Sequence, residues 1–133
     1  MNLTLDNAQK IAKACRAKAK EMGIPMVIAI VDQGANLVLL ERMEGAMIAG
    51  VSLAQDKAYT AAATGFDTHQ IAPLAQPGAI AYGLAGTNEG RMIVFPGGLA
   101  IKGKEGVMGG VGVAGGLANQ DQEVAQAGMK TFQ

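Results

Sequence analysis

Aromatic side chains are scarce in this sequence: two Tyr and three Phe make up 4% of the 133 residues, and tryptophan is absent. The one cysteine, Cys15, has no second cysteine with which to form a disulfide inside the chain. No run of 18 apolar residues occurs, so no membrane-spanning helix is expected. Eleven basic and eleven acidic residues cancel. Because no charge of one sign dominates, we expect neither nucleic acid nor a membrane as a partner.

Small and flexible side chains make up much of what is present. Hydrophobic residues account for 50% of the chain, many of them Ala, and there are 19 Gly and 8 Met. The length suits a single domain over residues 1–133. Small residues bury little area each, so we expect apolar surface to be covered by further copies in a homo-oligomer. Charged residues interrupt the amino-terminal segment, which argues against a secretory signal and predicts a cytoplasmic location.

The first part of the chain predicts one helix and one hairpin. Apolar residues recur at spacings of three and four over residues 5–22, which is the pattern of an amphipathic helix. Thr4 can cap this helix, and Gly23 ends it. Residues 26–31 and 37–40 are apolar and flank a turn-forming segment, so they predict two antiparallel strands.

The remaining segments predict two more helices, a short helix and three more strands. The helices are expected over residues 47–63, from an Asp67 cap to about Ala75, and from Asn119 with Gln122 as its capping-box partner; the strands are expected over 92–95, 99–101 and 107–114. Five mostly antiparallel strands with helices on both faces make a three-layer α+β domain.

Residues 110–115 spell G-x-G-x-x-G, which is also a dinucleotide-binding fingerprint. That site requires the motif between a strand and a helix of a βαβ unit, whereas here it lies within a strand and only residues 116–133 follow. Alternation along the strand instead leaves one face nearly bare. That face carries Met108, Gly110, Gly112 and Ala114, opposite Val107, Val111 and Val113. A helix of the same chain, a neighbouring subunit or a flat ligand must approach the bare face.

His69 is the one histidine of the chain. With a single His and a single Cys, no common zinc site can form within one chain. Ser52, the one serine, lies in the middle of a predicted helix, where nothing resembles a nucleophile elbow. His69 is therefore interpreted either as a solvated residue at the start of a helix or as a ligand or proton shuttle.

Five charged residues lie beside apolar segments: Asp32, Glu41, Arg42, Glu44 and Lys57. Ionisable groups in such places usually pair with one another for structural reasons. The functional alternative is a polar rim around a pocket for an anionic ligand.

Six segments together resemble one known family. They are Val31–Leu37, Arg42–Ala46, Lys57–Ala61, Phe95–Gly98, Gly110–Gly116 and Asp121–Gly128. In this order they are similar to the GlcG family, which includes the C-terminal domain of PduO and the haem-binding protein HbpS. The resemblance runs over essentially the whole chain and implies a profilin-like α/β/α fold with a five-stranded sheet, homo-oligomers and, for some members, haem.

Eight residues are candidates for holding a ligand. The candidates are His69, Asp32, Arg42, Glu44, Lys57, Phe95, Gly97 and Gly98. Residues 5–22 contain no histidine, so a haem ligand expected there is missing. His69 is then the best axial candidate, ahead of Tyr59, Tyr82, Cys15 and the methionines.

Three functional hypotheses follow from the sequence. The first is an oligomeric protein that binds haem or a related tetrapyrrole and is accessory to glycolate, diol or glycerol metabolism that depends on corrinoids. The second is a binding module for a small anionic metabolite. The third is an enzyme for a small hydroxy compound, against which the absence of nucleophile, metal and dinucleotide motifs counts.

Overall fold

The computed structural model describes residues 2–132. The helices are α1 (Leu5–Met22), α2 (Gly50–Thr64), α3 (Thr68–Ile71) and α4 (Ala118–Met129), the strands are β1 (Val27–Asp32), β2 (Leu37–Arg42), β3 (Gly98–Gly103) and β4 (Gly106–Ala114), and single 3₁₀ turns are η1 (Ala72–Ala75), η2 (Leu84–Gly86) and η3 (Asn88–Gly90). None of the helices described is long and apolar enough to cross a membrane.

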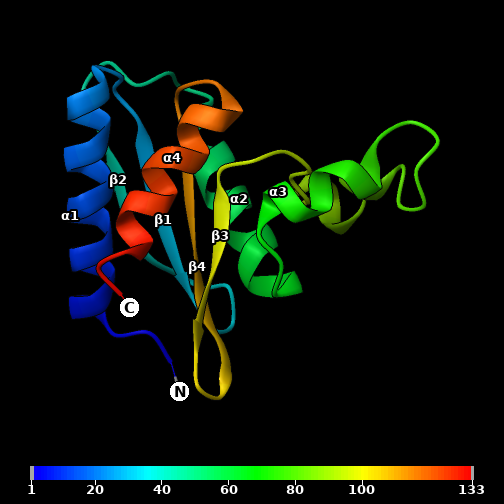
Figure 1. Ribbon diagram of the computed structural model, residues 1–133, viewed down its shortest axis with the longest axis horizontal. Helices are drawn as coiled ribbons and strands as arrows, with labels where there is room; N and C mark the ends of the chain where they lie inside the picture. The colour runs from blue at the N-terminus through cyan, green and yellow to red at the C-terminus, as the bar shows by residue number, and fades with distance from the viewer. Residues whose placement is uncertain (1, 133) are drawn as a thin grey trace.

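The four strands form one sheet in the order β2-β1-β4-β3, and every neighbouring pair is antiparallel. Figure 1 shows α1 and α4 on one side of this sheet and α2 on the other. Branched side chains of the sheet, such as Ile28, Ile30 and Val111, pack beneath α1 and α4. On the other side Ala54, Ala58 and Ala62 of α2 lie on the sheet. The predicted three-layer α+β arrangement is therefore confirmed.

The prediction of five strands is wrong, because residues 92–95 do not join the sheet. Their backbone runs along α2 instead, held by the hydroxyl of Thr60. This hydroxyl accepts a hydrogen bond from the nitrogen of Ile93 at 2.9 Å and donates one to the carbonyl of Arg91 at 2.9 Å. An apolar run looks the same in the sequence whether its backbone bonds to a strand or to a side chain, so the pattern could not separate the two cases.

The helix ends follow the expected capping chemistry with two corrections. Thr4 caps α1, accepting a hydrogen bond from the nitrogen of Asn7 at 3.1 Å, and Gly23 ends it in the left-handed conformation with φ of 73°. The helix expected from residue 47 begins at Gly50, because the preceding residues form turns. In α4 the residue that closes the amino-terminal turn is Gln120, which accepts from the nitrogen of Leu117 at 2.8 Å, rather than Gln122.

The nearly bare face of β4 lies against α2 of the same chain. A Cβ on Gly110 would overlap the carbonyl oxygen of Ala58, and one on Gly112 would overlap that of Ala54. Of the three occupants considered for this face, the structure therefore shows the helix of the same chain. Backbone meets backbone here, and only glycine leaves room for it.

The expected faces of Val107 and Met108 are exchanged in the structure. The register between β3 and β4 shifts beside these residues, so Ile101 pairs with Gly109 but Lys102 pairs with Val107. The extra residue of this β-bulge rotates the start of β4. Met108 therefore packs with the core under α1 and α4, and Val107 approaches Gly65 at the end of α2. Strict alternation from the sequence could not anticipate the bulge.

Residues 76–90 form an arm that projects away from the sheet and its helices (Figure 1). Ile80 is 94% exposed and Tyr82 is 68% exposed. Arg91 anchors the base of the arm, because its side chain donates to Asp56 at 2.9 Å and its guanidinium lies 3.9 Å from the ring centre of Tyr59. The arm is thus fixed at its base and presents apolar side chains to the outside.

Candidate functional site

The start of β3 and the start of α3 hold each other by hydrogen bonds. The nitrogen of Gly98 donates to the Thr68 hydroxyl at 2.9 Å, and the nitrogen of Ala100 donates to the Asp67 carboxylate at 2.9 Å. Both Gly98 and Thr68 are buried. These contacts place the next residue of α3, His69, at the surface beside the loop that leads into β3.

Gln122 of α4 joins His69 to this loop. The amide oxygen of Gln122 accepts a hydrogen bond from the nitrogen of Gly97 at 3.2 Å, and its amide nitrogen lies 3.2 Å from Nδ1 of His69. Among the described residues, no hydrogen bond engages Nε2 of the ring, and His69 is exposed. One nitrogen of the imidazole is therefore held by protein, and the other faces outward.

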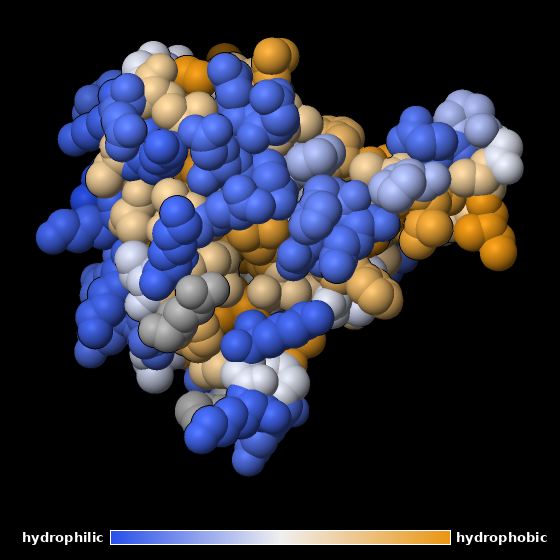
Figure 2. Space-filling model, in the orientation of Figure 1, coloured by the Kyte–Doolittle hydropathy of each residue, from blue (hydrophilic) through white to orange (hydrophobic). Residues whose placement is uncertain are grey.

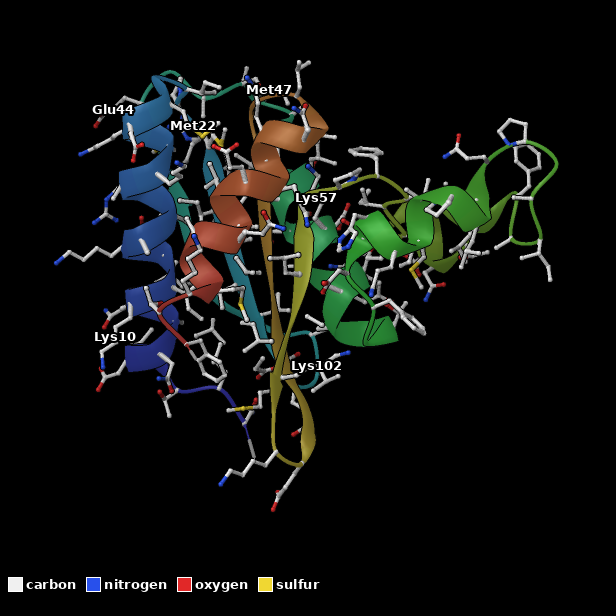
Figure 3. All side chains as sticks on the ribbon, viewed as in Figure 1. Lys10, Met22, Glu44, Met47, Lys57 and Lys102 are labelled. Carbon is white, nitrogen blue, oxygen red and sulfur yellow. The ribbon has the colours of Figure 1, made fainter. Side chains whose placement is uncertain are left out.

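Lys57 lies directly beneath the same loop, in the interior of the molecule (Figure 3). Its fully buried ammonium donates to the Asp121 carboxylate at 2.8 Å and to the carbonyl oxygen of Val113 at 2.8 Å. It also lies 5.2 Å from the ring centre of Phe95. A Cβ on Gly97 would come within 2.5 Å of the Lys57 ammonium, so the glycine is what allows the loop to pass over the lysine.

The buried pair is electrostatically costly as well as tightly bonded. Burial lowers the pKa of Lys57 and raises the pKa of Asp121, while the hydrogen bond between the two groups opposes both shifts. The other carboxylate oxygen of Asp121 accepts from the nitrogen of Gly116 at 2.8 Å. We interpret the pair as ionised and structural, because the ammonium and both carboxylate oxygens are hydrogen-bonded within the interior and neither side chain reaches the surface.

Five of the eight predicted site residues therefore lie together. They are His69, Lys57, Phe95, Gly97 and Gly98, and with Gln122 they make up what we call the His69 site. Phe95 is 40% exposed, so the surface of the site offers an imidazole and an aromatic ring, while Lys57 supports the loop from below.

Asp32 is not part of this site. It closes β1 at the end where that strand pairs with Gly109, whereas the His69 site lies near the opposite end of β4. Its carboxylate accepts from the nitrogens of Gly34 at 2.9 Å and Asn36 at 3.0 Å. These bonds, chiefly the one from the backbone of Asn36, lower the pKa of Asp32. The structure thus gives Asp32 the role of a turn residue.

Arg42 and Glu44 lie at a third place, beside the carboxyl-terminal end of α1. Figure 3 shows Glu44 there, apart from Lys57. The two residues line an open depression of about 430 Å³ with Arg16, Lys20, Glu41 and Met43. Arg16 is ion-paired with Glu41 in this depression. Positive and negative side chains therefore both surround the depression. The charged residues that were considered from the sequence as one polar rim thus lie at separate places in the structure.

The other axial candidates differ in how far they can reach a ligand. Cys15 is fully buried, and burial raises the pKa of its thiol to about 12, so it offers no thiolate at neutral pH. The hydroxyl of Tyr59 accepts from the amide of Asn88 at 3.0 Å. Tyr82 is exposed on the arm. Ser52 donates to the carbonyl of Ala49 at 3.5 Å, so the described contacts do not pair it with His69 as a nucleophile and base.

Gln122 of the His69 site, and Asp121, which pairs with Lys57 beneath it, were not identified as functional residues from the sequence. Both occur in the final motif, Asp121–Gly128, where they looked like residues of an ordinary helix start. A signal for Asp121 was nevertheless present, because a lysine in an otherwise apolar helix face, such as Lys57, needs a buried carboxylate as partner. No pattern in the sequence indicates that Gln122 touches His69, because 53 positions separate them.

A family model described as "Haem degrading protein HbpS-like" matches residues 3–130. The chain belongs to the HbpS-like family. An uncharacterized 15.0 kDa protein from the dhaT-dhaS intergenic region of Citrobacter freundii is 41% identical over 98% of this chain and 92% of its own length. The corrinoid adenosyltransferase PduO of the same organism is 34% identical over 95% of this chain, which spans 38% of the PduO length. The family predicted from the sequence motifs is thereby confirmed.

Solved structures of HbpS-like proteins share this fold. ORFY of Klebsiella pneumoniae superimposes with a TM-score of 0.95 at 40% identity, covering 98% of this chain and 90% of its own. A complex described as PduOC with haem superimposes with a TM-score of 0.94 at 32% identity, covering 98% of this chain and 94% of the PduOC chain. A double mutant of HbpS from Streptomyces reticuli superimposes with a TM-score of 0.92 at 28% identity, covering 100% of this chain and 88% of the HbpS chain.

Proposed function

We propose that this protein binds haem or a related tetrapyrrole, that it does so as a homo-oligomer, and that residues 1–133 act as one binding domain with His69 as the axial ligand. The observation that carries the proposal is the exposed imidazole of His69, with Nδ1 held by Gln122 and Nε2 facing outward. Imidazole is a common axial ligand of haem iron. The similar PduOC structure, whose description names haem, supports the choice of ligand.

Large exposed apolar residues lie near His69 in the chain or in the loop beside it, and would form one side of a haem site. Phe66, Leu74 and Phe95 are 58%, 50% and 40% exposed, and they lie in or next to the segments that carry His69 and its loop. Porphyrin faces require apolar contacts of this kind. The cavities described for the chain lie elsewhere; one of them is a largely apolar cleft of about 470 Å³ beside Val107, Met108 and Phe132. His69, Phe66, Leu74 and Phe95 would therefore hold one face of the macrocycle, and a second subunit would cover the other. Bound haem would supply a Lewis-acidic iron centre.

The arm supports the homo-oligomer. Figure 2 shows hydrophobic side chains near the tip of the arm, where no part of the same chain covers them. Ile80 and Tyr82 are 94% and 68% exposed. A projecting segment with large exposed apolar residues is typical of a surface that packs against another molecule. We propose that this other molecule is a second copy.

Replacing Ile80 and Tyr82 together with Ser is expected to lower the molar mass in solution. The wild-type protein should have a mass that is a multiple of 13.6 kDa, and the double variant should shift toward the monomer because the apolar contact is lost. Light scattering after size-exclusion chromatography measures this. Leu37→Ser is the control, since Leu37 is 50% exposed on an edge strand away from the arm. A monomeric wild type, or an arm variant with unchanged mass, contradicts this role of the arm.

Replacing His69 with Ala is expected to weaken hemin binding at least about tenfold, which corresponds to about 1.4 kcal/mol, and to shift the Soret band. Coordination by an imidazole is lost in this variant, whereas apolar contacts with the macrocycle remain. A spectrophotometric hemin titration of both proteins measures the two effects. Arg42→Ala is the matched control, because Arg42 lies in the separate depression beside α1. If His69→Ala has no effect and Arg42→Ala weakens binding, the ligand site is that depression.

An accessory role in corrinoid-dependent metabolism belongs to this proposal as well. The relative named for the dhaT-dhaS region and the PduO relative support it, because this chain matches the former along 92% of its length and a part of the latter. We place the protein in the cytoplasm, where a single reduced thiol such as Cys15 is common. A binding module or enzyme for a small anionic or hydroxy metabolite is the alternative, and the depression around Arg42 and Glu44 is where such a ligand would bind.

A further inference from the structure

The orientation of the Gln122 amide is fixed by a backbone group. The nitrogen of Gly97 can only donate, so the group of Gln122 that lies 3.2 Å from it must be the amide oxygen. The amide nitrogen, which is also a donor, is therefore the group that faces Nδ1 of His69 at 3.2 Å. This assignment does not depend on how the His69 protons are placed.

The fixed amide determines the tautomer of His69. A donor opposite Nδ1 requires that Nδ1 accept, so the proton of the neutral ring must reside on Nε2. The outward-facing nitrogen of His69 thus carries a proton in the protein without ligand. In this form the ring presents a hydrogen-bond donor to the outside rather than a lone pair.

Coordination of iron by the outward-facing nitrogen requires the opposite tautomer. Nε2 must then offer its lone pair, and the proton must move to Nδ1. Nδ1 would become a donor and would face the amide nitrogen of Gln122, so the amide must rotate to present its oxygen. That rotation takes the oxygen away from the nitrogen of Gly97. Gly97 is buried and belongs to the loop that lies over Lys57.

We propose that Gln122 is a positioning residue for His69: its amide sets which imidazole nitrogen carries the proton, and it couples binding at Nε2 to the Pro96–Gly98 loop. This inference rests on the proposed function, since it assumes that His69 binds through Nε2. It predicts that the wild-type glutamine limits the affinity for haem, because each binding event must break the contact between Gln122 and Gly97. A side chain that accepts from both partners should remove this limit.

Gln122→Glu provides such a side chain. A carboxylate accepts at both oxygens, so it can keep the contact with Gly97 and also accept from a protonated Nδ1. The variant should therefore hold His69 in the tautomer that binds iron. The ¹⁵N spectrum of the ligand-free protein, labelled in its one histidine and recorded at an alkaline pH where the imidazole is neutral, should show the proton on Nε2 in the wild type and on Nδ1 in Gln122→Glu.

The same variant is expected to bind hemin about tenfold more tightly than the wild type, which is the lower end of the effect of residues that hydrogen-bond to a metal-bound histidine. Gln126→Glu is the matched control. It makes the same change of charge one turn further along α4, at an exposed residue for which no contact with His69 is described. Its ¹⁵N spectrum and its hemin affinity should equal those of the wild type.

The two readouts separate the failure of this inference from the failure of the proposed function. A wild-type spectrum with the proton on Nδ1, or an unchanged spectrum in Gln122→Glu, overturns the positioning role of Gln122. A changed tautomer without tighter hemin binding shows that Gln122 positions the ring but that iron is not bound at Nε2, which overturns the coupling. If Gln126→Glu binds hemin as tightly as Gln122→Glu does, the gain in affinity comes from the added charge alone, and the coupling through Gln122 is overturned.

Discussion

Gly112→Ala is expected to lower the free energy of unfolding by about 3 kcal/mol, at the upper end of the usual cost of overpacking. A Cβ at this position would overlap the carbonyl oxygen of Ala54 and lie 2.6 Å from the nitrogen of Ala58. Both atoms belong to the backbone of α2, so no side chain can rotate away, and the helix itself must move. Chemical denaturation at a fixed protein concentration, followed by circular dichroism, measures the loss.

Gly86→Ala is the control for this substitution. Gly86 is exposed, no atom lies within 4 Å of a Cβ placed there, and its φ is not positive. The same change of residue should therefore alter the stability by less than about 0.5 kcal/mol. If Gly112→Ala is as stable as Gly86→Ala, the close approach of α2 and β4 does not exist in solution.

Lys57→Met is expected to destabilise the protein by about 3–5 kcal/mol, because it leaves the carboxylate of Asp121 buried without its partner. Adding Asp121→Asn should restore part of that loss. The asparagine oxygen can still accept from the nitrogen of Gly116, and no unpaired charge remains. For comparison, Asp56→Asn removes the partly exposed pair with Arg91 and should cost about 0.2–1 kcal/mol. Unfolding free energies of the three variants and the wild type test this ranking.

The loss caused by Lys57→Met should also depend on pH. Burial already raises the pKa of Asp121 above its ordinary value of 3.8, and the ammonium of Lys57 opposes this shift. In the Lys57→Met variant the ammonium is gone, so the pKa of Asp121 should rise further. A raised pKa in the folded state favours folding at low pH, and this contribution disappears as the pH rises through the folded pKa. The variant should therefore be closer to the wild type near pH 4 than near pH 8. A deficit that grows as the pH falls would contradict the burial of an unpaired Asp121.

The elements with strong local signals could be predicted from the sequence. The helix over residues 5–22 has a regular apolar stripe and good caps, and it was found with both ends correct. The bare face of Gly110 and Gly112 correctly indicated a close approach, although three occupants remained open until the structure showed α2. These features depend on neighbours in the sequence, or on the alternation of a single strand.

The features that depend on contacts between distant segments could not be predicted. Residues 92–95 look like a strand, yet the nitrogen of Ile93 donates its hydrogen bond to the Thr60 hydroxyl of α2. The β-bulge near Met108 exists only relative to its partner strand. The projecting arm of residues 76–90 had no assignment, because its Gly-rich and Pro-containing composition predicts turns without placing them in space.

The candidate site was predicted only in part, because it too depends on contacts between distant segments. His69 was singled out as the one histidine, and the motifs supplied Lys57 and the Phe95–Gly98 loop; the structure brings these residues together. Charge alone grouped Asp32, Arg42 and Glu44 with them, but strand direction places these residues on other surfaces. The homo-oligomer itself, and the surfaces that would meet in it, depend on a second copy and stay a prediction.

The central claim, that His69 binds the metal of a tetrapyrrole, is tested most directly by ¹⁵N spectra of the histidine-labelled protein with and without zinc protoporphyrin. This diamagnetic analogue leaves the imidazole signals observable, and His69 is the only histidine that can contribute to them. Coordination should shift the Nε2 resonance and place the proton on Nδ1 at saturating porphyrin. Unchanged imidazole resonances, while the absorbance spectrum shows that porphyrin is bound, would contradict the claim.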